Sequence, residues 1–128
     1  MRLRNSALVP ATSLALIALV SCDALDVVAH DITAPTVAIT GISNGETIID
    51  PRTITITAHD TESNLTFVDI FYDGSRINDD EPNSQSFATN LTLLTGRANA
   101  GQHTIEVRAT DAAQNKTTLG LSFTVFAP

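Results

Sequence analysis

Apolar and polar residues alternate along most of the chain after residue 35. The alternation is clearest over residues 53–58, where Ile54, Ile56 and Ala58 share one face and threonines fill the other. A period of two is typical of a strand that is buried on one face only, and β-branched residues favour such strands. We therefore predict a strand over residues 53–58, with its two isoleucines in a core.

The same alternation recurs in five other segments, and no helical period appears between them. Turns rich in Gly, Asn, Asp and Ser separate the segments. The core-facing residues are Val37 and Ile39; Val68, Ile70 and Tyr72; Phe87, Thr89, Leu91 and Leu93; His103, Ile105, Val107 and Ala109; and Leu119, Leu121, Phe123 and Val125. Six or seven short strands in about 93 residues are typical of a two-sheet Greek-key sandwich, so we predict one all-β domain over residues 36–128.

The first 22 residues have the pattern of an export signal. Arg2 and Arg4 supply positive charge, Leu14 to Val20 form an apolar run, and Ser21 precedes the only cysteine, Cys22. The run is far shorter than the roughly 20 residues that a membrane-spanning helix needs. The segment resembles the lipobox of bacterial lipoproteins, which implies cleavage before Cys22 and attachment of lipid to it. A plain secretory signal with a chance cysteine, or a buried N-terminal helix, remains the alternative.

A lipobox divides the start of the chain into a signal peptide, residues 1–21, and a tether, residues 22–35. Several acyl chains on Cys22 would hold the protein stably on a membrane without a transmembrane helix. Asp23 resembles the inner-membrane retention signal of enterobacterial lipoproteins, a rule that other bacteria do not follow, so the leaflet stays open. Ala34-Pro35 marks the boundary with the first strand.

Removal of residues 1–21 leaves five basic side chains against fourteen acidic ones, a formal charge of −9. Nucleic acids and anionic head groups need clustered Lys and Arg. We therefore expect no nucleic-acid partner, and we interpret the acidic residues as the solvated surface of a folded domain. With a single cysteine in the chain, no internal disulfide is expected.

Three stretches resemble the bacterial immunoglobulin-like domain family: Ala34-Pro35-Thr36-Val37, Val68 to Gly74, and Gly101 to Asn115. The last stretch follows the family pattern except that Gln114 stands where a glycine is usual. The resemblance covers about residues 34–126 and implies an immunoglobulin-like Greek-key β-sandwich of about seven antiparallel strands. It implies no particular ligand, because one fold hosts many functions.

An internal echo supplies a candidate metal site. Residues 56–64 and 107–115 share the pattern of two inward apolar residues, then Asp, then Asn four residues later. In an immunoglobulin-like fold these are the B–C and F–G loops, which meet at the end of the sandwich where the tether joins. Oxygen ligands from several loops suit Ca²⁺, whereas the alternative is that these residues only cap their own turns. The candidate ligands are Asp60, Glu62, Asp111 and Asp31; no other cofactor is expected.

The histidines do not form a catalytic pattern. His103 shares its parity with core residues, which predicts a hydrogen-bonded structural role, whereas His59 is expected at the surface and His30 in the tether. The chain has no Gly-x-Ser-x-Gly motif and no zinc-ligand spacing. We therefore expect a protein that is not an enzyme, and no small-molecule substrate is evident.

Two aromatic residues offer a candidate binding surface. Phe67 and Phe71 have the opposite parity to Val68 and Ile70, so they point away from the core. Exposed aromatic rings suit a protein partner or a glycan; the alternative is that a neighbouring loop or the tether covers them.

Together these patterns predict a bacterial cell-envelope lipoprotein on the exported side of a membrane. Its partners would be the membrane, through lipid on Cys22, and an envelope protein or polysaccharide. A single immunoglobulin-like domain would act as a non-enzymatic, adhesion-type binding module. The alternative function is a structural spacer or accessory subunit without a ligand site of its own.

Overall fold

The computed structural model describes residues 30–128, which include the whole predicted sandwich domain. The predicted signal peptide and most of the tether, with Cys22 and Asp23, lie outside the described residues. Residues 31–128 form one compact unit. In the described part of the chain, no helix is long and apolar enough to cross a membrane.

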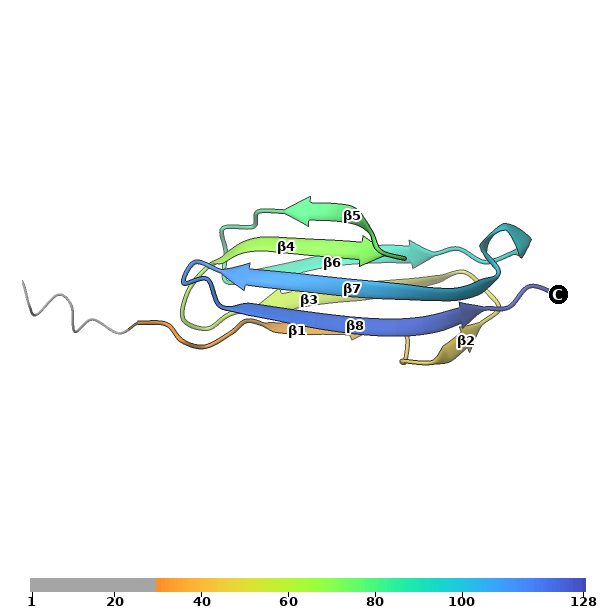
Figure 1. Cartoon of the computed structure of the whole chain (residues 1–128), viewed down its shortest axis with the longest axis horizontal. Coiled ribbons are helices and arrows are strands. Elements are labelled where there is room, and N and C mark those ends of the chain that lie inside the picture. Colours follow the sequence, from red (N-terminus) through yellow and green to blue (C-terminus); the bar gives the residue numbers. More distant parts are fainter. Residues whose placement is uncertain (1–29) are drawn as a thin grey trace, which may run out of the picture. The chain divides into compact units, whose positions relative to one another are not determined.

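Two β-sheets face each other in this unit (Figure 1). The smaller sheet has the order β1-β3-β6, and the larger has the order β2-β8-β7-β4-β5. The strands are β1 (Thr36–Thr40), β2 (Glu46–Ile48), β3 (Arg52–His59), β4 (Leu65–Tyr72), β5 (Ser75–Asp80), β6 (Ser86–Leu93), β7 (Gly101–Asp111) and β8 (Lys116–Val125), with one 3₁₀ turn at Arg97–Asn99. The predicted all-β, immunoglobulin-like sandwich is confirmed.

The core forms where the apolar faces of the two sheets meet. In β3, Ile54, Ile56 and Ala58 are at most 2% exposed, as their alternation predicts. Each large aliphatic side chain buried in this way contributes roughly 1.5–3 kcal/mol. The buried apolar residues are Ile42, Ile48, Ile54, Ile56, Ala58, Leu65, Val68, Ile70, Leu93, Ile105, Val107, Ala109, Phe123 and Val125.

Strand β2 differs from the prediction of antiparallel strands alone. It pairs in parallel with β8, whereas β1 pairs antiparallel with β3 of the other sheet. The chain therefore leaves one sheet after Thr40 and joins the other at Glu46 without reversing its direction. Only Ile48 of β2 is buried, so this three-residue strand carries no alternation from which to predict it.

Two glycines make the change of sheet possible. Gly41 and Gly45 have φ values of 98° and 82°, a region that costs other L-residues free energy. Around them, the Gly45 N–H donates to the Ser122 carbonyl at 2.7 Å, and Glu46 pairs with Arg52. The hydrogen bond from the Ser43 N–H, followed by the interaction with Arg52, lowers the pKa of Glu46.

Substitutions at three glycines should separate backbone conformation from crowding. A Cβ at Gly41 would lie 3.1 Å from the Thr53 carbonyl oxygen, whereas at Gly45 and Gly120 it would meet nothing within 4 Å. We expect Gly41→Ala to lower the free energy of unfolding by about 2–4 kcal/mol and Gly45→Ala by about 1–2 kcal/mol. Gly120→Ala, in ordinary strand backbone, should leave stability unchanged or raise it by up to about 1 kcal/mol. Urea unfolding measures all three; equal losses at Gly41 and Gly45 would contradict the crowding argument.

Candidate functional site

Three acidic side chains meet at one end of the sandwich. Asp60 follows β3, Asp111 ends β7, and Asp31 lies before β1, in the segment that enters the domain at that end (Figure 1). One carboxylate oxygen from each lies within 4.8 Å of the others. Asp60 is 2% exposed and Asp111 is 0% exposed. We call Asp31, Asp60 and Asp111 the carboxylate cluster; it contains three of the four predicted ligands.

Glu62, the fourth predicted ligand, lies outside this cluster. Its Oε1 accepts a hydrogen bond from the Thr33 hydroxyl instead. Glu62 thus binds the segment before β1 at a different point from Asp31. The sequence echo could not separate the two carboxylates, because it specifies loop positions and not side-chain directions.

Both buried aspartates cap their own loops, as the turn interpretation predicts. Oδ1 of Asp60 accepts the N–H groups of Glu62 and Ser63 at 2.8 and 2.7 Å. Oδ1 of Asp111 accepts the N–H groups of Ala113 and Asn115, both at 2.8 Å. These hydrogen bonds hold the B–C and F–G loops in shape and fix the direction of each carboxylate.

The B–C and F–G loops differ in the hydrogen bonding of the second carboxylate oxygen, Oδ2, of their aspartates. Asn115 Nδ2 donates to Asp111 Oδ2 at 2.9 Å. Asn64, its counterpart, directs its amide toward Asn83 Oδ1 at 3.5 Å. Within the described residues, Oδ2 of Asp60 is therefore buried with no hydrogen-bond partner.

The segment before β1 is held against both loops. Asp31 Oδ2 accepts the Ser63 hydroxyl at 2.6 Å, and Asn115 Nδ2 lies 3.1 Å from the Asp31 carbonyl oxygen. Further along, Thr117 donates to the Pro35 carbonyl at 2.5 Å. Residues 31–35 thus follow the domain surface.

Gln114, the departure from the family pattern, lies in the F–G loop. Its φ is 74°, so the turn does require the left-handed region in which glycine is favoured. The Gln114 N–H donates to the Asp111 carbonyl at 3.1 Å. The turn therefore has the conformation that favours glycine, although a glutamine occupies this position.

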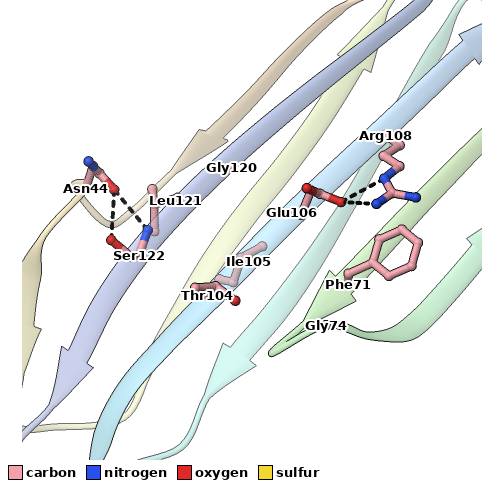
Figure 2. A pocket seen from close by; sticks show the side chains of 10 residues that line it. All are labelled: Asn44, Phe71, Gly74, Thr104, Ile105, Glu106, Arg108, Gly120, Leu121 and Ser122. Carbon is pink, nitrogen blue, oxygen red and sulfur yellow. Dashed lines mark hydrogen bonds and ion pairs between the residues drawn. The ribbon is translucent and has the colours of Figure 1, made fainter.

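An open groove lies on the outer face of the larger sheet, with a volume of about 600 Å³ (Figure 2). Phe71, Glu106 and Gly120 follow one another across β4, β7 and β8. Gly120 has no side chain at the β8 end of this row, so the sheet face is hollowed there. Asn44 and Ser122 line one side of the groove, and Asn44 Oδ1 accepts the Ser122 N–H at 2.9 Å.

Arg108 covers the aromatic ring at the other side of the groove (Figure 2). Its guanidinium carbon lies 4.3 Å from the centre of the Phe71 ring, and its Nη2 lies 2.6 Å from Glu106 Oε1. Phe67 is 46% exposed and does not line the groove. Of the two aromatic residues predicted to face outward, only Phe71 belongs to the hollow.

Sequence reasoning missed the groove itself. Its shape depends on which residues are neighbours across three strands, and the pairing register was not predicted. One available signal was Gly120 within an otherwise alternating strand, because an isolated strand glycine often marks close approach by a ligand or another backbone.

His103 has the structural role that its parity predicts. Nδ1 lies 2.7 Å from Asp73 Oδ2 and Nε2 lies 2.8 Å from the Asn99 carbonyl oxygen. The ring also packs against Tyr72 and Phe123, which contact each other. Burial lowers the pKa of His103, but the hydrogen bonds to Asp73 and Asn99 outweigh it, so the pKa is raised. Burial raises the pKa of Asp73, yet the bonds from His103 and Thr104 outweigh it, so the pKa is lowered.

The other histidines stand apart from His103. His59, exposed as predicted, bonds through Nδ1 to the Ser86 hydroxyl at 3.0 Å, and His30 is exposed before β1. The described part of the chain therefore assembles no group of histidines around a shared site.

The fold is that of an immunoglobulin-like sandwich module, with the carboxylate cluster at one end and the groove on one sheet face. The family model for the bacterial Ig domain matches residues 35–107. The chain belongs to this family, as the sequence resemblance predicted. Domains of this kind are generally non-catalytic.

Solved structures that are similar to this chain include two from bacteria. One contains the fibronectin(III)-like modules of Clostridium thermocellum CbhA, at 22% identity over 72% of this chain and 96% of that one, with a TM-score of 0.44. The other is the PKD1 domain of Vibrio anguillarum Epp, at 18% identity over 75% of this chain and 98% of that one, with a TM-score of 0.49. No curated protein matches the chain.

The His103–Asp73 pair should make stability depend on pH. The pKa of His103 is raised in the folded state. The pair therefore contributes its full stabilisation below about pH 6.5, the ordinary pKa of histidine, and this stabilisation is lost as pH rises through the folded pKa. The lowered pKa of Asp73 gives a contribution that is full above about pH 4 and is lost at lower pH. We therefore expect the stability difference between wild type and His103→Gln to be largest near pH 5 and smaller at pH 8.5.

Urea unfolding of both proteins at pH 5, 7 and 8.5 measures this difference. In an Asp73→Asn background, the same His103 substitution should show a weaker pH dependence, because the Asp73 charge is gone and only the Asn99 carbonyl still favours the protonated ring. A difference that is constant with pH in the wild-type background would contradict the ion-pair argument.

Proposed function

We propose that this protein is a lipid-anchored protein of the bacterial cell envelope whose immunoglobulin-like domain binds a neutral polysaccharide without catalysis. The short apolar run before Cys22 supports the anchor. Membership of the bacterial Ig domain family supports a non-catalytic module. The groove on the outer sheet face supports binding and is the single observation on which the partner depends.

The chemistry of the groove favours a polysaccharide over a compact ligand. Its lining combines hydroxyl, amide, carboxylate and guanidinium groups with one aromatic ring, the donors, acceptors and flat apolar surface that sugars use. The groove lies open on a sheet face (Figure 2) and suits an extended chain. The predicted charge of the mature protein, −9, disfavours anionic polymers, so the proposed partner is neutral.

A structural spacer is the alternative, and one observation favours it. Arg108 forms an ion pair with Glu106 and stacks over the Phe71 ring, so these three side chains in the groove interact with one another without a ligand. In a spacer, the segment before β1 and the C-terminus would connect to different neighbours, because they lie at opposite ends of the sandwich (Figure 1). Binding measurements separate the two functions.

Phe71→Ser should weaken polysaccharide binding about tenfold, because it removes the only aromatic face in the groove. Phe67→Ser is the matched control: it removes an aromatic ring from the same strand and outer face but lies outside the groove. Retention on columns of neutral envelope polysaccharides measures both variants of residues 22–128 with Cys22→Ser, after circular dichroism has verified their folding.

Equal losses in the two variants would contradict a role for the groove. If wild type is retained on no neutral polysaccharide, the spacer function is favoured. Stoichiometric retention of one purified envelope protein instead would replace the proposed class of partner.

The anchor has its own test in the producing bacterium. Wild type should incorporate labelled palmitate, and Cys22→Ala should incorporate none, because the only thiol in the chain is gone. Ser21→Ala is the matched control, since it keeps a small residue before the cysteine and should keep the label. Label on the Cys22→Ala variant, or none on wild type, would overturn the proposed lipid anchor.

A further inference from the structure

The carboxylate cluster concentrates negative charge where solvent cannot screen it. Two of its three members, Asp60 and Asp111, are at least 98% buried. Like charges at such short separation repel strongly in a medium of low polarity, and buried carboxylates are normally paired or bound to metal. Among residues 30–128, the ion pairs of Arg52, Arg76 and Arg108 all lie elsewhere. No cationic side chain in that range neutralises Asp60 or Asp111.

Asp60 gives a second, independent indication of a ligand. Its Oδ1 is used fully by the loop N–H groups, but its buried Oδ2 has no partner within the described residues. Buried polar atoms in folded proteins nearly always have one. Because Asn115 provides that partner for Asp111 and Asn64 does not provide it for Asp60, loop capping explains Asp111 but leaves Asp60 incomplete.

We propose that the carboxylate cluster binds one Ca²⁺ ion through Asp31, Asp60 and Asp111. All three donors are oxygens, which hard cations prefer. Two ligands that each lie about 2.4 Å from one Ca²⁺ can be up to about 4.8 Å apart, and one oxygen from each aspartate satisfies that limit. Ca²⁺ takes six to eight oxygen ligands in irregular arrangements, so water and main-chain carbonyls complete the set. Mg²⁺ requires shorter distances and a regular octahedron.

The ion connects three segments that are distant in sequence. Asp31 precedes β1, Asp60 begins the B–C loop and Asp111 begins the F–G loop. The hydrogen bonds from Ser63 and Asn115 already bring Asp31 to both loops. Bound Ca²⁺ adds charge compensation to these contacts and fixes where the chain enters the domain. The three ligands do not line the groove, so this site is independent of the proposed polysaccharide function.

The test uses residues 22–128 with Cys22→Ser, so that the N-terminal amine stays away from Asp31. Isothermal titration with Ca²⁺ should give one ion per chain. At a Ca²⁺ concentration ten times Kd the folding constant rises about 11-fold, which raises Tm by roughly 6–11 °C for a domain of this size. Mg²⁺ at the same concentration should produce less than a third of that shift.

Asp60→Asn is the decisive variant, because it keeps the Oδ1 acceptor and removes the charge and the unpartnered oxygen. We expect it to fold and to lose the Ca²⁺-dependent rise in Tm. Asp31→Asn, outside the strands, should lose at least tenfold in Ca²⁺ affinity even if Asp60→Asn fails to fold. Asp50→Asn is the matched control, since it removes an exposed carboxylate between β2 and β3 and should behave as wild type.

Three results would overturn the proposal. One is the absence of both binding heat and a Tm shift in wild type with Ca²⁺. Another is an equal shift with Mg²⁺. The third is unchanged Ca²⁺ affinity in Asp31→Asn or Asp60→Asn.

Discussion

The structure depends on the burial of two one-sided apolar sheet faces against each other. Ile54 and Ile56 of the smaller sheet and Ile105 and Val107 of the larger sheet are fully buried in this layer. Because the strands give one face to the core, their other face lies at the surface and is available for recognition. The groove lies on the outer face of β4, β7 and β8. It is hollow where Gly120 provides no side chain on that face.

The same alternation explains why polar side chains are buried at the ends of the strands. Asp60 comes two residues after the inward-facing Ala58, and Asp111 comes two residues after Ala109. Each aspartate side chain therefore points into the sandwich, as the alternation of its strand requires, at the position where the strand ends. In each loop, main-chain N–H groups donate to one carboxylate oxygen of the aspartate. These hydrogen bonds offset part of the free-energy cost of burying the carboxylate, and they fix the conformation of the turn.

Strand β7 carries an inward-facing ionisable residue near each end. At one end His103 meets Asp73 and a carbonyl oxygen, so both ring nitrogens have acceptors and the protonated ring is favoured. At the other end Asp111 meets two further carboxylates and no cationic side chain from residues 30–128. The two ends differ in how charge is balanced: one contains its own ion pair, and the other is the site for which we propose a cation from solution.

The sequence by itself determined the class of fold, most strands and their buried faces, because a period of two is a local property of the chain. It also brought Asp60 and Asp111 into one prediction, because the echo repeats at equivalent strand ends, and it added Asp31 because the tether joins the domain at the same end. Only the tertiary structure decided what depends on register and on contacts between distant segments: the parallel strand β2, the groove over Gly120, the separation of Glu62 from the cluster and the unpartnered oxygen of Asp60. Alternation fixes which face a residue occupies, but it does not fix which residue from another strand lies beside it.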